Sequence, residues 1–158
     1  MVSEETFRRV MGHFATGVTV VASRGPEGEP VGLTVNAFSS VSLDPPMVLI
    51  CIHEGADAHD PLLEAGHFGV SFLKTDQSEL AFRFSREESD YRFRNLKVVE
   101  GSLGSPIILN SLAWMECRIR QVFPGGDHSV ILGDVVECGS GEGDPLLFFK
   151  GSLMDNDP

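Results

Sequence analysis

The chain has 158 residues, 42% of them hydrophobic and 22% charged, which fits one domain, residues 1–158, around one packed core. The formal net charge of -11 argues against nucleic acid as a partner and against docking to an anionic membrane. The cysteines Cys51, Cys117 and Cys138 form no zinc or disulfide pattern, and no apolar run approaches the roughly 20 residues of a membrane span, so we expect a cytoplasmic protein.

The first third of the chain predicts one helix followed by a run of strands. A helix is expected over residues 3–14, because Ser3 can cap it and apolar side chains recur on one face. Short strands rich in β-branched residues are expected at 17–23, 31–34, 39–43 and 47–52. The last of these is continuously apolar, so we expect it to be buried on both faces of a sheet.

The rest of the chain alternates between short helices and strands. Helices are expected at 60–65, with Pro61 at the first position, and at 77–84, capped by Thr75 or Asp76. Residues 85–95 are polar and predict a loop or an irregular helix. Strands are expected at 67–73, 112–122, 129–137 and 146–149, with Glu116 on the polar face of the second and turns at 124–126 and 139–145. Many short strands and few helices predict a mainly β fold, an antiparallel sheet closing into a barrel.

Several common catalytic signatures are absent from the sequence. It contains no glycine-rich dinucleotide or Walker loop, no G-x-S-x-G elbow and no H-E-x-x-H helix. None of the five histidines has a partner at metal-ligand spacing, so no metal site is expected.

Residues 32–41 (GLTVNAFSSV) place small hydroxyl and amide side chains around a corner between two strands. Such groups, together with the exposed backbone of the corner, can hydrogen-bond a planar heteroaromatic ring. The alternative interpretation is a β-turn with Asn36 at the bend and serines facing water.

Residues 124–128 (PGGDH) place a histidine directly after two glycines. The glycines allow a tight turn or a close approach of backbone to a ligand, and the strand that follows would fix the His128 ring. His128 is therefore a candidate proton donor or cofactor contact. The alternative is an exposed histidine in an ordinary turn.

Taken together, six segments in this order resemble the flavin reductase domain family, the small reductase components of two-component flavin-dependent monooxygenases. They are FRRVMGHFATGVTVVAS, VGLTVNAFSSVSLDPPMVLICI, HFGVSFL with QSELAFRFS, LAWMECRI, PGGDHSVILGDV and GDPLLFFKG, and they cover nearly the whole chain. The resemblance implies an FMN-binding split β-barrel with Greek-key connections and a few short helices. It also implies a homodimer with the flavin near the subunit interface.

The resemblance further implies which residues hold the ligands. His128 would lie where the nicotinamide approaches the flavin and would be the catalytic residue. The cofactor-binding residues would be Thr34, Val35, Asn36, Ala37, Ser39, Ser40, Cys51, Ile52, His53, Phe84, Ser85, Arg92 and Phe93. The cofactors would be FMN or FAD, with NADH or NADPH as hydride donor.

Two segments depart from the family pattern. Residues 53–59 lack the hydroxyl side chains that often hold phosphate in the family, and the carboxylates of Glu54 and Asp57 would repel it. Backbone N–H groups, His59, or the guanidinium groups of Arg83, Arg86 and Arg92 are the alternative phosphate ligands, which leaves FMN and FAD both open. Residues 151–153 also lack the aromatic residue often found there.

The leading hypothesis is an enzyme that reduces FMN or FAD with NAD(P)H and supplies reduced flavin to a separate monooxygenase. Such an enzyme needs no nucleophile, because it aligns the nicotinamide with the flavin and excludes water. Two alternatives stay open at this point: a non-catalytic module of the same fold that binds flavin or haem, and a deazaflavin-dependent reductase.

Overall fold

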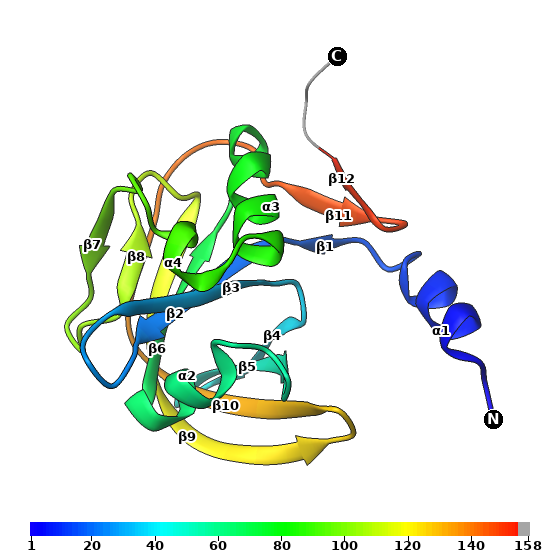
Figure 1. Ribbon diagram of the computed structural model, residues 1–158, viewed down its shortest axis with the longest axis horizontal. Coiled ribbons are helices and arrows are strands. Elements are labelled where there is room, and N and C mark those ends of the chain that lie inside the picture. Colours follow the sequence, from blue (N-terminus) through cyan, green and yellow to red (C-terminus); the bar gives the residue numbers. More distant parts are fainter. Residues whose placement is uncertain (155–158) are drawn as a thin grey trace.

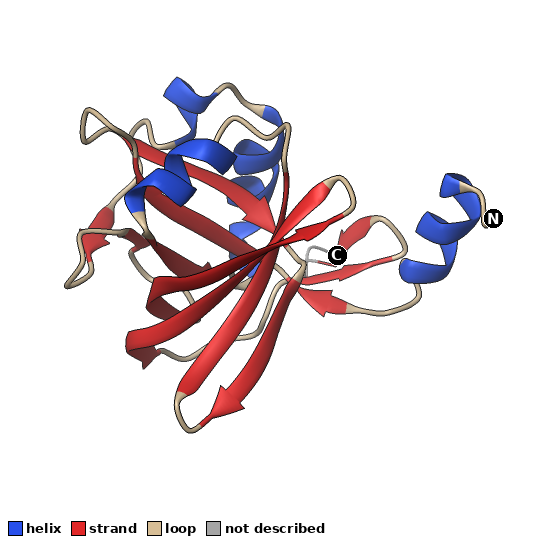
Figure 2. Ribbon diagram, turned by 90° about the horizontal axis from the view of Figure 1, so that it is seen from below, coloured by secondary structure: helices blue, strands red, loops and turns tan. Residues whose placement is uncertain are grey.

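The computed structural model describes residues 1–154 and is built mainly of antiparallel strands (Figure 1). A seven-stranded sheet has the order β3-β2-β6-β9-β10-β5-β4. In that order its strands are Pro30–Val35, Thr19–Arg24, His67–Phe72, Ala113–Gly125, His128–Ser140, Pro46–His53 and Phe38–Leu43. The sheet curls strongly, as Figure 2 shows, and this antiparallel split barrel confirms the predicted fold class.

Two small sheets complete the architecture. Strands β1 (Thr16–Gly17), β11 (Leu147–Phe149) and β12 (Ser152–Met154) form one, so the strand that follows the N-terminal helix pairs with a hairpin from the last part of the described chain. Strands β7 (Val98–Glu100) and β8 (Pro106–Ile108) form the other. We did not predict β7, β8 or β12, because three residues are too few to show an alternating pattern.

The helices are short and differ from the predictions at their ends. They are α1 (Glu4–Met11), α2 (His59–Ala65), α3 (Ser78–Arg86) and α4 (Ser89–Arg92), with a 3-10 turn, η1, at Thr75–Gln77. Ser3 caps α1 as expected, and its hydroxyl accepts from the Thr6 N–H at 3.2 Å. Pro61 was wrongly expected to start α2, which begins two residues earlier. The expected caps of the 77–84 helix instead belong to η1.

Two hydrophobic clusters occupy the two sides of the main sheet. The larger lies inside the curled sheet and is closed by Leu62 of α2. The smaller lies under α3, which contributes Ala81 and Phe84. The smaller cluster packs α3 against β2, a hydrogen bond from Thr34 ties α3 to β3, and this placement creates the groove described below.

Strand β5 corrects one expectation, because only one of its faces is in the core. Val48, Ile50 and Ile52 point inward, whereas Met47, Leu49 and Cys51 on the other face are only half-buried. The residues opposite them on β10 are similar: Val130 pairs with Cys51 and Leu132 with Leu49. Because directly opposite residues share a face, these side chains form an apolar patch that the described residues leave partly uncovered.

Helix α1 stands away from the rest of the fold (Figure 1). None of its residues is buried, and the apolar side chains of Phe7, Val10 and Met11 are exposed, as is that of Phe14, three residues beyond the end of the helix. The helix is therefore amphipathic, and residues 1–154 provide no surface that covers its apolar face. Among the described residues, no helix has the length and apolar character needed to cross a membrane.

Candidate functional site

A groove of about 540 Å³ opens between the end of β3, the outer face of α3 and the hairpin of β11 and β12. Its lining combines apolar side chains with a few hydroxyl, amide and guanidinium groups. The lining residues are Val18, Thr34, Asn36, Ala81, Phe82, Ser85, Arg86, Phe148, Gly151, Ser152 and Leu153. This combination of size and lining is typical of sites for planar organic ligands.

Besides Ala81, helix α3 supplies the groove with three outward-facing side chains, which the helical period places on one face. Ala81 and Phe84 face the smaller core cluster, so the outward face carries Phe82, Ser85 and Arg86, spaced three and four residues apart. From this helix we had predicted Phe84 and Ser85 as cofactor-binding residues, with Arg83 and Arg86 as alternative phosphate ligands. The outward positions of an amphipathic helix beside the site were the signal that would also have identified Phe82.

Three predicted site residues line this groove. The Thr34 hydroxyl donates to the Ala81 carbonyl at 2.6 Å, which ties β3 to α3. The Asn36 amide lies 3.4 Å from the Thr16 hydroxyl, and the Ser85 hydroxyl donates to the Phe82 carbonyl at 3.0 Å. The groove is thus held together by the same polar groups that line it.

A second group of predicted residues lies at the β4 edge of the sheet, along β4, β5 and the corner between β3 and β4. Ala37, Ser39, Ser40 and His53 are exposed, and Cys51 is half-buried, which raises the pKa of its thiol. The Cys51 N–H donates to the Ala37 carbonyl at 3.0 Å, so the corner is held against β5. None of these residues lines the groove.

The remaining predicted cofactor-binding residues are packed inside the protein. Val35 and Ile52 belong to the larger core cluster, while Phe84 and Phe93 pack edge to face in the smaller one, with ring centroids 4.9 Å apart. Arg92 is 8% exposed, and its guanidinium donates to the carbonyls of Gly32 and Glu87 and to the Asp57 carboxylate. These contacts are structural, and ligand binding by the five residues stays a prediction.

His128 begins β10, directly after the two-residue turn Gly126–Asp127 that joins it to β9. The predicted turn at 124–126 was therefore displaced, because Pro124 and Gly125 still pair within the hairpin. His128 Nδ1 lies 2.6 Å from Asp127 Oδ1, and this hydrogen bond lowers the pKa of the Asp127 carboxyl. With Nδ1 held by the carboxylate, Nε2 is the nitrogen left for other contacts.

His53 faces His128 across the two strands. The residues are direct partners in the register of β5 and β10, and their rings meet edge to face with centroids 5.2 Å apart. His53 Nδ1 accepts from the Gly55 N–H at 2.9 Å, while His53 Nε2 lies 3.9 Å from Asp127 Oδ2. The structure thus brings together two predicted site residues from different motifs.

Residues 54–59, which follow β5, repel an anion less than the two carboxylates in their sequence suggested. Asp57 is paired with Arg92 at 2.8 Å, so its charge is already balanced. His59, one alternative phosphate ligand, is instead turned inward: its ring bridges Asp60 Oδ1 at 2.7 Å and the buried Ser129 hydroxyl at 2.8 Å. Among the described residues, no cluster of acidic, histidine and cysteine side chains is suited to a metal ion.

Comparison with known proteins gives a match over nearly the whole chain. The model of the flavin reductase like domain matches residues 11–156. The chain is 41% identical over 151 residues to the FMN reductase (NADH) SmoA of Agrobacterium fabrum, covering 96% of this chain and 85% of the relative. It is 37% identical to the flavin reductase (NADH) of Kitasatospora aureofaciens, covering 100% of this chain and 86% of the relative.

Solved structures show the same fold. The NADH:FAD oxidoreductase SgcE6 of Streptomyces globisporus superposes with a TM-score of 0.91 at 36% identity, covering 100% of this chain and 98% of the other. BorF, the flavin reductase component of a bacterial two-component tryptophan halogenase, gives a TM-score of 0.89 at 34% identity and covers 96% and 97% of the two chains.

Proposed function

Because this chain belongs to the family of flavin reductase like domains, we propose that it is an NAD(P)H:flavin oxidoreductase that reduces FMN or FAD. The observation that carries the proposal is the groove between β3, α3 and the C-terminal hairpin, in a chain whose match spans almost its full length. Three relatives are named as NADH-dependent reductases, which supports NADH as the donor. Residues 1–158 would act as a single domain.

The groove fits a flavin ring. Val18, Phe148 and Leu153 offer apolar contact to the faces of a flat tricyclic ring, and the Asn36 amide offers hydrogen bonds at its edge. When bound, the flavin supplies the hydride acceptor, and the protein contributes position and exclusion of water. Ala37, Ser39, Ser40, Cys51 and His53 lie at the β4 edge of the sheet, where the outer part of the cofactor or the nicotinamide would pass.

His128 is the proposed catalytic residue. Asp127 accepts from Nδ1, so the ring presents Nε2 in a fixed direction. A ring held in this way can orient the carboxamide of a nicotinamide or hold a proton beside the reacting pair. His53, which packs against it, limits the directions in which the ring can turn.

We propose that the active form is a homodimer. The half-buried patch on β5 and β10 and the uncovered apolar face of α1 are two surfaces that a second copy of the chain would bury. His128 does not line the groove of its own chain, which supports a site shared with a partner.

The reduced flavin would pass to a separate monooxygenase, as in relatives named as reductase components of monooxygenases. The three free cysteines support the cytoplasm as the compartment.

The test is a turnover assay with each combination of flavin and nicotinamide. Protein, FMN or FAD, and NADH or NADPH are mixed, and the absorbance of the reduced nicotinamide is followed. We expect consumption that depends on added flavin and is faster with NADH. Saturable flavin binding without nicotinamide consumption would instead identify a non-catalytic binding module. If the protein neither binds flavin nor consumes nicotinamide, the proposal that it is a flavin protein is refuted.

A further inference from the structure

A second cleft adjoins the flavin groove on the outer side of α3. It has a volume of about 470 Å³ and lies between α3, α4 and the loop that follows α4. We call it the arginine cleft, and its lining residues are Glu79, Phe82, Arg83, Arg86, Glu87, Tyr91, Arg94 and Asn95. Phe82 and Arg86 line both hollows, so the arginine cleft continues the groove.

The guanidinium groups of this cleft are unusual in a chain of net charge -11. Arg86 lies over the Phe82 ring at 4.6 Å, and Arg94 lies over the Tyr91 ring at 4.1 Å. Neither side chain forms an ion pair or a side-chain hydrogen bond within residues 1–154, although Glu79 and Glu87 line the same cleft. Exposed guanidinium groups that keep their donors unused are suited to phosphate oxygens.

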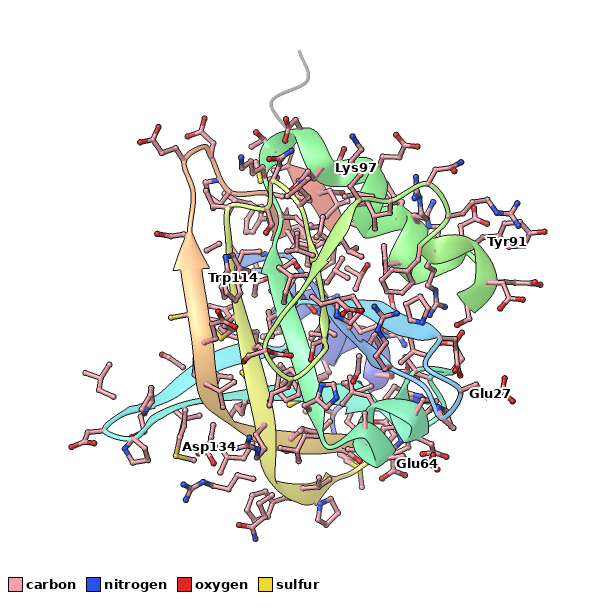
Figure 3. The ribbon with its side chains drawn as sticks, turned by 90° about the vertical axis from the view of Figure 1, so that its left-hand side faces the viewer. Glu27, Glu64, Tyr91, Lys97, Trp114 and Asp134 are labelled. Atoms are coloured by element: carbon pink, nitrogen blue, oxygen red, sulfur yellow. The ribbon has the colours of Figure 1, made fainter. Side chains whose placement is uncertain are left out.

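The cleft also offers aromatic surface and a fixed frame. Phe82 is 41% exposed and Tyr91 is 45% exposed, and Tyr91 stands on the outer edge of the helical side in Figure 3. Arg83 donates to the carbonyls of Arg92 and Arg94, which holds the loop after α4 in place. Aromatic faces beside cations are a common means of binding a base together with its phosphate.

We infer that the arginine cleft binds the adenylate half of FAD when the flavin ring occupies the groove. Arg86, at the junction of the two hollows, would meet the pyrophosphate, and Arg94 with Tyr91 would meet the adenosine end. The carboxylates of Glu79 and Glu87 are acceptors for the ribose hydroxyls. The inference rests on the proposed function, because it assumes that the ring binds in the groove.

The experiment compares FAD with FMN, because only FAD carries the adenylate. Dissociation constants for both flavins are measured by fluorescence titration for the wild type, Arg94→Gln and Tyr91→Leu. Arg86 is left unchanged because it also lines the groove. We expect each variant to weaken FAD binding by about tenfold, the usual worth of one stacking or charged contact, with FMN binding unchanged. Lys97→Gln, which removes one positive charge outside the cleft, is the matched control and should change neither.

The outcomes separate the inference from the proposed function. Equal FAD and FMN affinities in wild type and variants, or an equal loss for both flavins, would overturn the adenylate site while leaving flavin reduction intact. A rise in KM for NADH but not for reduced nicotinamide mononucleotide, with FAD affinity unchanged, would assign the cleft to NADH and also overturn it. A wild-type protein that binds neither flavin would refute the proposed function itself.

Discussion

His128 is held at two levels, since β10 fixes its backbone and Asp127 fixes its ring. His128→Ala removes the ring without disturbing the core, because the side chain is 41% exposed. We expect kcat to fall by tenfold to roughly a thousandfold, the usual worth of a positioned acid, base or hydrogen-bond donor, with flavin affinity nearly unchanged. Steady-state kinetics and flavin titration on one preparation separate the two effects. His128→Gln, which keeps a hydrogen-bonding group at that position, should recover part of the rate. A wild-type kcat in the Ala variant would show that His128 has no catalytic role.

Glu116 is a single residue whose burial the alternating pattern of its strand did not predict. The alternation of β9 placed it on the polar face, yet it is fully buried. Its carboxylate accepts from the N–H groups of Leu103 and Ser105, at 2.9 and 2.8 Å, and from the Ser102 hydroxyl at 3.3 Å. Gly101 lies so close to it that a Cβ there would clash. This loop contact joins distant parts of the chain, so no local pattern predicts it.

The same contacts make the stability of the fold depend on Glu116 and on pH. Burial alone would raise the pKa of Glu116, but the N–H and hydroxyl donors outweigh it and hold the pKa below its ordinary value of 4.5. The ionised form therefore stabilises the fold fully above that value, and the contribution disappears as pH falls through the lowered native pKa. Glu116→Ala should lose about 3 kcal/mol at pH 7, because the buried Ser105 N–H and the part-buried Leu103 N–H lose their acceptor. Urea unfolding between pH 7 and 3 should also be flatter for Glu116→Gln than for the wild type; parallel curves would show that Glu116 titrates alike in both states.

At the scale of elements, periodicity predicted the strands of the main sheet and the inner face of α3. It failed where an element is fixed by distant contacts. Strand β7 exists because it pairs with β8, and β12 because it pairs with β11. The groove lies between β3, α3 and this last hairpin, so Thr34, Asn36 and Ser85 were predictable from motifs while Phe148 and residues 151–153 were not.

Arg92 was predicted to bind the cofactor, but its contacts in the structure stabilise the packing of α4 against β3. Its guanidinium ties α4 to β3 through the Gly32 carbonyl at 2.7 Å and to Asp57 at 2.8 Å. A lysine cannot reproduce this forked arrangement, so Arg92→Lys should reduce the free energy of unfolding by about 1–3 kcal/mol. Chemical denaturation measures this loss, and FMN titration of the folded variant measures binding. An FMN affinity reduced tenfold in a variant of normal stability would restore Arg92 as a cofactor ligand.

At the scale of the whole molecule, the sequence predicts burial wrongly where an apolar surface is left uncovered by a single copy of the chain. The continuous run Met47–Ile52 predicted a strand buried on both faces, but within one chain only Val48, Ile50 and Ile52 reach the core. A partner that covers Met47, Leu49 and Cys51 would make the expectation correct for the assembly. In the proposed homodimer, the apolar composition of β5 would therefore report burial in the assembly rather than within one chain.

Leu132 provides the test of that assembly. It pairs with Leu49 at the middle of the patch and is half-buried in one chain. Light scattering after size exclusion should give the wild type about twice the 17.2 kDa chain mass, as two copies require. Leu132→Arg would place a charge inside the interface, where desolvation costs several kcal/mol, so we expect a folded monomer with impaired turnover. Val99→Arg is the matched control, because Val99 is an exposed apolar residue on β7, outside the patch, and this variant should stay a dimer. A Leu132→Arg protein that remains dimeric and active would exclude this face as the interface, and a monomeric wild type with full turnover would exclude the shared site.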